Sequence, residues 1–180
     1  YYREKLNRVF DVTVSYTWVR SSFKDKHGDY IPSAWDNRNI VNVTTLASLK
    51  RNWDIGIKWR FVGGAPYTPY DFNRSSLIDA WDATGQGYLD YNKYNTERLN
   101  VFHQLDLRVD KQYYFKKWSL NLYLDITNLY NFKAQQPDEL VQVRDANGQP
   151  VIKDPLNYQL KYLPSESGTV LPTIGIIVEI

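Results

Sequence analysis

The sequence predicts an all-β chain whose strands form an antiparallel, up-and-down segment of a transmembrane β-barrel. Three observations predict this fold class. Apolar and polar residues alternate with a period of two along several segments, which is typical of strands with two unlike faces. Most of these segments exceed the roughly 5–6 residues of an ordinary strand. Short and long connections alternate along the chain, so the long loops all fall at one end of the sheet.

The first predicted strand spans residues 6–20. Phe10 and Val12 share one side of this strand, whereas Asp11 and Thr13 share the other. The residues that follow are polar and charged and include a glycine and a proline, so we expect a loop there.

Two further strands, predicted at 38–49 and 53–63, are joined by a tight turn. Trp53 and Ile55 lie on one side of the later strand, and Asp54 lies on the other. A connection this short predicts that the two strands pair in antiparallel fashion.

The longest alternation lies in a hairpin whose strands are predicted at 99–114 and 118–131. In the first of them, Leu105 and its apolar neighbours alternate with Asp106 and other polar residues. The last predicted strand, 171–180, also alternates. The charged faces of these strands need a polar environment along their whole length.

Three long loops connect the strands, and they span 21–37, 64–98 and 132–170. In the second loop, residues 75–81 are expected to form one helical turn capped by a serine. In the third, Asn147 and Gly148 predict a turn in a small ribbon. This turn faintly resembles a calcium loop, but it lacks the closing glutamate at the required spacing, so we predict no metal site there.

The predicted strands meet the roughly 9–11 residues that a strand needs to cross a bilayer. Their apolar faces would then contact lipid, and their polar faces would line a lumen. A soluble up-and-down barrel is the alternative, but it explains neither the strand length nor the loop asymmetry. Aromatic residues cluster near both strand ends, as in the girdles of membrane barrels. These residues are Trp53, Tyr113, Tyr114 and Trp118 at the short-turn end, and Trp18, Trp59, Phe61 and Tyr130 at the long-loop end.

One histidine departs from this pattern, because His103 lies on the apolar side of its predicted strand. Either an interfacial position near the long loops or a local β-bulge would explain it. Bacterial membrane barrels have at least about eight strands, so about six strands need others to close the sheet. We expect these other strands to precede Tyr1.

The composition excludes several classes of function. A net charge of +2 gives no electrostatic case for binding nucleic acid. The absence of cysteine excludes disulfides, thiolate catalysis and cysteine metal sites. His27 and His103 lie far apart, and the sequence offers no paired carboxylates, nucleophile or phosphate-binding glycine loop. We therefore predict no enzyme activity, no cofactor and no metal.

Five pieces of the sequence occur in the order typical of one family, and they are 35–39, 64–69, 104–110, 122–131 and 172–176. Among them are an Asp-x-Arg start of a strand, a Gly-Ala-Pro-Tyr-Thr-Pro segment and an Asn-Leu-Tyr-Asn segment, the last being the most specific. With these pieces, the chain resembles the C-terminal barrel of TonB-dependent outer-membrane receptors, especially those of the Bacteroidota. The resemblance covers essentially the whole chain.

The resemblance implies a barrel of about 22 strands, plugged by an N-terminal domain, in the outer membrane of a Gram-negative bacterium. Such receptors take up scarce or large nutrients such as glycans, siderophores or haem, corrinoids, or peptides. The TonB–ExbB–ExbD complex drives this uptake through the plug. Further implied partners are membrane lipid, the remaining strands of the same protein and, by analogy, a surface lipoprotein over the long loops. A passive, porin-like outer-membrane channel is the alternative, and a barrel enzyme or adhesin is a third class.

Two sets of residues are candidates for function. Aromatic side chains in the long loops could stack on a ligand, or equally could pack the loops together or meet a partner protein. They are Trp35, Tyr67, Tyr70, Trp81, Tyr88, Tyr91, Tyr94, Tyr158 and Tyr162. Charged residues on the polar faces could contact substrate, although we expect them to pair with one another or with the plug. They are Asp54, Lys58, Arg60, Asp106, Arg108, Asp110 and Asp125.

Overall fold

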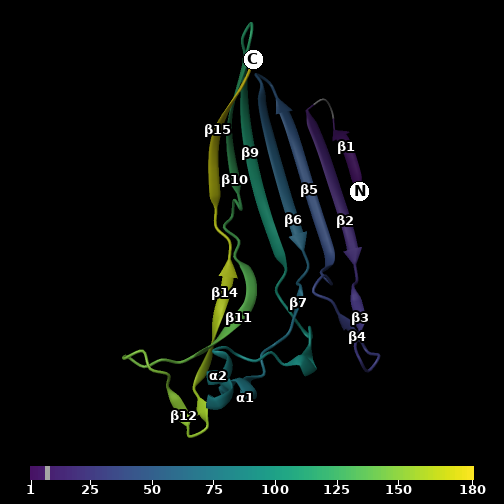
Figure 1. The fold of residues 1–180 in the computed structure, drawn as a ribbon. Helices are drawn as coiled ribbons and strands as arrows, with labels where there is room; N and C mark the ends of the chain where they lie inside the picture. The colour runs from purple at the N-terminus through teal and green to yellow at the C-terminus, as the bar shows by residue number, and fades with distance from the viewer. Residues whose placement is uncertain (7–8) are drawn as a thin grey trace.

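A computed structural model describes residues 1–6 and 9–180 as one long antiparallel sheet with an elaborate set of loops at one end (Figure 1). The prediction of an all-β, antiparallel fold is confirmed. The sheet has the order β1-β2-β5-β6-β9-β10-β15. Its strands are β1 (Tyr2–Leu6), β2 (Phe10–Val19), β5 (Arg38–Leu49), β6 (Trp53–Val62), β9 (Phe102–Tyr114), β10 (Ser119–Thr127) and β15 (Leu171–Glu179).

The order of the strands in the sheet follows their order in the sequence, and neighbours pair in antiparallel fashion, as in an up-and-down meander. Tight connections lie at one end, and the long loops gather at the other, together with α1, α2 and β12 (Figure 1). This arrangement agrees with the predicted alternation of short and long connections. Within the described residues the sheet is open, because β1 and β15 each have a neighbour on one side only.

The sheet contains seven strands where six were predicted. Residues 2–6 pair with β2 in an unbroken register from Tyr2 opposite Val14 to Leu6 opposite Phe10. The pattern missed β1 because its residues are mostly charged; Arg3 forms an ion pair with Asp11 on the neighbouring strand. Residues 7 and 8 of the first predicted strand lie outside the described residues.

Two predicted strand ends differ from the structure. The strand predicted at 118–131 ends at Thr127, because Asn128 has a φ of 57° and turns the chain out of the ladder. The strand predicted at 99–114 begins at Phe102. Before it, β8 (Glu97–Arg98) forms a separate short pairing with β7 (Pro66–Tyr67).

The register places all seven predicted charged residues on one face of the sheet. Asp54 lies opposite Asp110, Lys58 opposite Asp106, and Asp125 opposite Arg108. Arg60 alternates with Lys58 on the same strand and therefore shares this face. We call it the polar face below.

The opposite face, called the apolar face below, carries most of the hydrophobic residues of the long strands. Ile57 lies opposite Leu107, and Leu122 lies opposite Ile176. Several of these side chains have no cover, since Ile174 is 82% exposed and Ile176 is 68% exposed. The sheet therefore does not bury its own apolar face within the described chain.

His103 sits on the apolar face without a bulge, because the register of β6 and β9 is continuous through it. Its Nδ1 lies 2.6 Å from Tyr130 Oη, and its ring centroid lies 4.1 Å from that of Phe132. Of the two explanations offered for His103, the bulge is wrong. The histidine belongs to an aromatic group at the long-loop end of the face.

Two charged residues, Lys111 and Glu4, also lie on the apolar face and were not predicted there; Glu4 lies opposite Val12 on the edge strand β1. Lys111 lies toward the short-turn end of β9, between Trp53 of β6 and Leu122 of β10. Its amine donates a hydrogen bond to the Arg51 carbonyl and lies 5.1 Å from the Trp53 ring and 5.2 Å from the Tyr113 ring. The long side chain thus carries its charge to the edge of the sheet.

The loops carry secondary structure of their own. Asp71, not a serine, caps the first helix by accepting a hydrogen bond from the Arg74 amide, and Asn147–Gly148 forms the predicted turn beside an Arg144–Pro150 bridge. None of the described helices is long and apolar enough to span a bilayer. The loop elements are β3 (Ser22–Lys24), β4 (Tyr30–Pro32), α1 (Phe72–Ser76), α2 (Ile78–Thr84), η1 (Tyr91–Lys93), β11 (Ala134–Gln142), β12 (Ile152–Asp154), β13 (Asn157–Tyr158) and β14 (Leu160–Ser167).

Candidate functional site

The hydrophobic core of the chain lies in its loops and not in its sheet. Trp81 from α2, Leu140 from β11 and Leu160 from β14 are each less than 10% exposed and pack together, with Tyr70 and Tyr158 against them. This burial gives Trp81 a packing role, which is one of the alternatives expected for the loop aromatics. It also joins the loop that contains α2 to the loop that contains β11 and β14.

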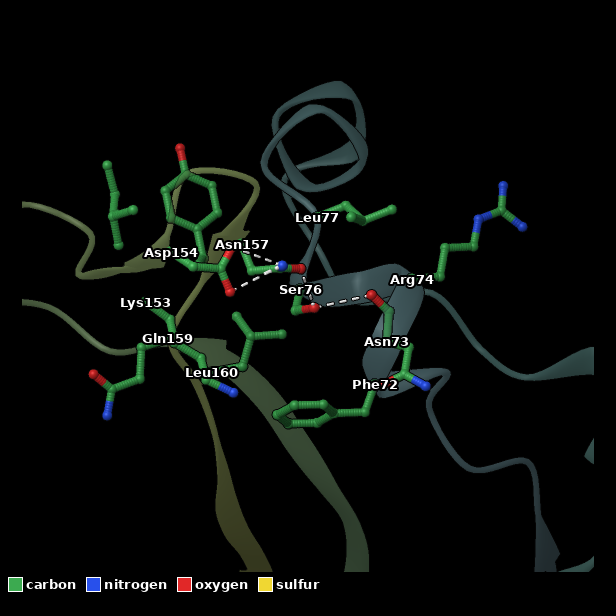
Figure 2. A pocket seen from close by; sticks show the side chains of 12 residues that line it. Phe72, Asn73, Arg74, Ser76, Leu77, Lys153, Asp154, Asn157, Gln159 and Leu160 are labelled. Atoms are coloured by element: carbon green, nitrogen blue, oxygen red, sulfur yellow. Dashed lines mark hydrogen bonds between the residues drawn. The ribbon is translucent and has the colours of Figure 1, made fainter.

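A polar seam joins the same two loops (Figure 2). Ser76 Oγ donates to Asn157 Oδ1 at 2.8 Å, and Asn157 Nδ2 donates to Asp154 Oδ1 at 2.9 Å. The Ile78 amide donates to the Leu156 carbonyl at 2.9 Å. A cavity of about 890 Å³ lies beside this seam. Figure 2 shows side chains that line it, among them Arg74. The two longest loops are therefore fixed relative to each other.

A buried ion pair anchors the loops to the end of the sheet. Asp36 is 2% exposed and pairs with Arg98, whose Nη1 also donates to the Asp36 carbonyl at 2.7 Å and to the Gly64 carbonyl at 2.9 Å. Burial of Asp36 opposes its ionisation, but the Ser21 amide and the Arg98 guanidinium outweigh burial and lower the pKa of Asp36. Three loop segments thus meet at one charged carboxylate.

A second anchor closes the third long loop. Asn128 is 5% exposed, and its side chain accepts from the Phe132 amide at 2.8 Å and donates to the carbonyls of Phe132 and Thr169. Its own amide donates to Asp106 Oδ1 at 3.0 Å. One asparagine therefore holds both ends of the loop at the point where β10 ends.

Among these anchored loops, five tyrosines line a pocket of about 600 Å³. We call it the tyrosine pocket; its lining includes Tyr67, Tyr70, Tyr91, Tyr94 and Tyr162. Five of the nine candidate loop aromatics are thus brought together. A volume of this size lies within the range of small-molecule binding sites.

Two carboxylates that the sequence reasoning did not single out also line the tyrosine pocket. Glu97 lies on β8 and Asp138 lies on β11. Burial, and then the charges of Glu97 and Asp138, raise the pKa of Tyr67. Sequence reasoning missed these acids because no local pattern connects two charged residues from separate loops.

The other predicted aromatic residues lie elsewhere. Trp35 is 77% exposed, and the guanidinium carbon of Arg74 lies 4.3 Å from the centre of the Tyr88 ring. Tyr158 Oη donates to Asp82 Oδ1 at 3.1 Å beside the seam. These residues do not line the tyrosine pocket.

The charged residues of the polar face pair largely with one another. Arg108 Nε lies 2.8 Å from Asp110 Oδ2, and its Nη1 lies 3.9 Å from Asp125 Oδ2. Arg60 Nη2 lies 3.6 Å from Asp106 Oδ2. Lys58, with Asp106 and Arg108, lines a hollow of about 290 Å³ over Gly56. The described residues contain no group of three or more metal-ligating side chains.

Comparison of the sequence with known protein families found no match, and comparison with curated proteins found no match either. The sheet, its two unlike faces and the tyrosine pocket are therefore the basis for a functional assignment.

Proposed function

We propose that this chain forms part of a transmembrane β-barrel in the outer membrane of a Gram-negative bacterium, and that the barrel takes up a nutrient in a TonB-dependent manner. The observation that carries the proposal is the sheet itself. Seven antiparallel strands present one largely apolar face and one face that carries most of the charged residues, and their long loops gather at one end.

The membrane part of the proposal rests on what would cover the apolar face. Leu122 and Ile176 face outward from the middle of neighbouring strands. Such a face exposed to water would favour aggregation, whereas hydrocarbon is a suitable neighbour for it along its whole height. The strands β5 and β9 contain 12 and 13 residues, which is more than the roughly 9–11 needed to cross a bilayer.

The positions of two polar residues of β9 on the apolar face support the same orientation. Lys111 and His103 lie at opposite ends of β9, each beside aromatic rings. Polar side chains near aromatic rings are typical of the two membrane–water interfaces. In this orientation the charged face lines the barrel lumen, and further strands of the same protein pair with the free edges of β1 and β15.

The uptake part of the proposal rests on the resemblance to TonB-dependent receptors. The residues that carry this resemblance have structural tasks that a receptor barrel would need: Asp36 and Gly64 anchor the loops, and Asn128 closes the third loop. The tyrosine pocket supplies a binding site among the loops. Ligand uptake through a plugged barrel uses such a site, whereas a passive channel does not require one.

The full-length protein allows a direct test of uptake. Cells that produce it are grown with ferrichrome, haem, cyanocobalamin, maltohexaose or a peptide digest as the sole source of the relevant nutrient, with and without a working TonB complex. We expect uptake of one of these to require both the protein and TonB. In planar bilayers, we expect the purified protein to conduct no steady ion current; a constant open pore would identify a passive channel and contradict the proposal.

A further inference from the structure

We propose that the tyrosine pocket binds a positively charged group of the imported ligand, namely an amine or a guanidinium such as the basic side chain of a peptide. This inference rests on the proposed function and names the class of ligand that its loop-end site selects. Three features of the tyrosine pocket lead to it: its charge, its aromatic faces and its rigid walls.

The charge of the tyrosine pocket is entirely negative. Glu97 and Asp138 contribute carboxylates from two different loops, and the described lining residues include no lysine, arginine or histidine. Neither carboxylate makes an ion pair or a side-chain hydrogen bond within the described part of the chain. A cation that enters would therefore meet two acceptors that need no prior release from a protein partner.

The aromatic faces favour the same kind of ligand. Tyr91 and Tyr94 stack with ring centroids 6.2 Å apart and an angle of 16° between their planes. The negative face of an aromatic ring attracts an ammonium or a guanidinium. The chain already makes this contact elsewhere, with Arg108 lying 4.2 Å from the centre of the Tyr123 ring.

The remaining lining of the tyrosine pocket fits a cation on an aliphatic stem. Pro69, Leu89 and Pro137 place apolar surface beside the carboxylates. Basic side chains bury such a stem against apolar surface while their charged end makes polar contacts. An anionic ligand, such as an acidic glycan, would be repelled by two uncompensated carboxylates.

The walls of the tyrosine pocket are held in place before a ligand arrives. Glu97 and Tyr67 pair across β7 and β8, and Asp138 and Tyr162 come from the paired strands β11 and β14. The Trp81 core and the Ser76–Asn157 seam join these two loops. A site that is already ordered loses less conformational entropy on binding.

The test uses two blocked tripeptides, Ala-Arg-Ala and Ala-citrulline-Ala, which differ in charge but hardly in shape. Their affinities for the purified full-length protein in detergent are measured by calorimetry, with maltohexaose as a neutral carbohydrate probe. We expect the arginine peptide to bind at least about tenfold more tightly than the citrulline peptide, because only a cation gains the charge-assisted hydrogen bonds. Equal affinity for the two peptides, or binding of neither, would overturn the proposal.

Substitutions place the effect in the tyrosine pocket. Glu97→Gln and Asp138→Asn should each weaken binding of the arginine peptide about tenfold and leave the citrulline peptide unaffected. Glu139→Gln, an exposed neighbour on the same strand as Asp138, is the matched control and should change nothing. Binding of maltohexaose alone would show instead a pocket for neutral sugars. Because these titrations contain no TonB, their failure is distinguishable from a failure of TonB-dependent uptake.

Discussion

At the scale of single residues, the ion pair between Asp36 and Arg98 anchors the loop end of the chain. A carboxylate that is 2% exposed keeps its charge only because it has charged and hydrogen-bonding partners. Arg98→Met leaves that charge buried and unpaired, and we expect it to lower the free energy of unfolding by about 3–5 kcal/mol. Denaturant unfolding of the protein in detergent micelles measures this.

Arg38→Met is the matched control for that substitution. Arg38 Nε lies 3.9 Å from Asp36 Oδ2, but the Arg38 side chain is 57% exposed, so its loss should cost only about 0–1 kcal/mol. Equal effects of the two substitutions would mean that Arg98 is not the main partner of Asp36.

Acid should weaken the same anchor. Because the pKa of Asp36 is lower in the folded protein than in the unfolded chain, its contribution to stability is present at neutral pH. That contribution falls as the pH drops below the ordinary aspartate pKa of about 3.9 and approaches the folded pKa. The Arg98→Met protein should lose the part of this pH dependence that Arg98 supplies, and an unchanged acid profile would contradict the assignment.

Asn128 gives a second prediction for single residues. Asn128→Ala removes three side-chain hydrogen bonds and leaves a non-glycine residue at a φ of 57°. We expect a loss of about 2–4 kcal/mol, measured by the same denaturant unfolding. Asn131→Ala is the control, because Asn131 has a φ of 56° but is exposed and makes no side-chain hydrogen bond in the described structure. A similar loss at both positions would assign the effect to backbone conformation alone.

At the scale of elements, close approach of two backbones fixes where the sheet passes into the loops. A Cβ on Gly64 would lie 1.8 Å from the Leu99 carbonyl oxygen, whereas a Cβ on Gly56 would lie 3.4 Å from a flexible Leu46 side chain. We therefore expect Gly64→Ala to destabilise the loops by about 1–3 kcal/mol or more, and Gly56→Ala to be tolerated. Limited proteolysis of the loops measures the difference, and equal resistance to protease would contradict it.

The elements were predictable to different degrees. The strand 38–49 coincides with β5, because long period-two alternation is a local property of the sequence. The end of β10 at Thr127 was not predictable, since it depends on hydrogen bonds that Asn128 makes to residues up to 41 positions away. The tyrosine pocket was predictable only as a set of loop aromatics. Its acids, Glu97 and Asp138, become neighbours only after two loops pack around Trp81.

At the scale of the whole molecule, one feature explains most of the sequence: the sheet has two faces with opposite requirements. On the polar face, Arg108, Asp110 and Asp125 satisfy one another, so this face is stable beside a lumen or a plug. On the apolar face, side chains such as Ile174 and Ile176 are left uncovered by the described chain, so this face needs a large apolar neighbour. The proposed membrane location supplies that neighbour.

The most direct test compares two neighbouring residues of β10 that point in opposite directions. Leu122 lies opposite Ile176 on the apolar face, and Asn121 donates to Asp110 on the polar face. Leu122→Arg would place a second cation opposite Lys111 on the apolar face, where a charge held in hydrocarbon costs up to about 2–4 kcal/mol, whereas Asn121→Arg would have the Asp110 carboxylate as a partner. Outer-membrane fractions of cells that produce the full-length protein are examined for the heat-modifiable folded band. We predict that Leu122→Arg abolishes this band and that Asn121→Arg retains it; equal tolerance of both, or the reverse order, would contradict the account.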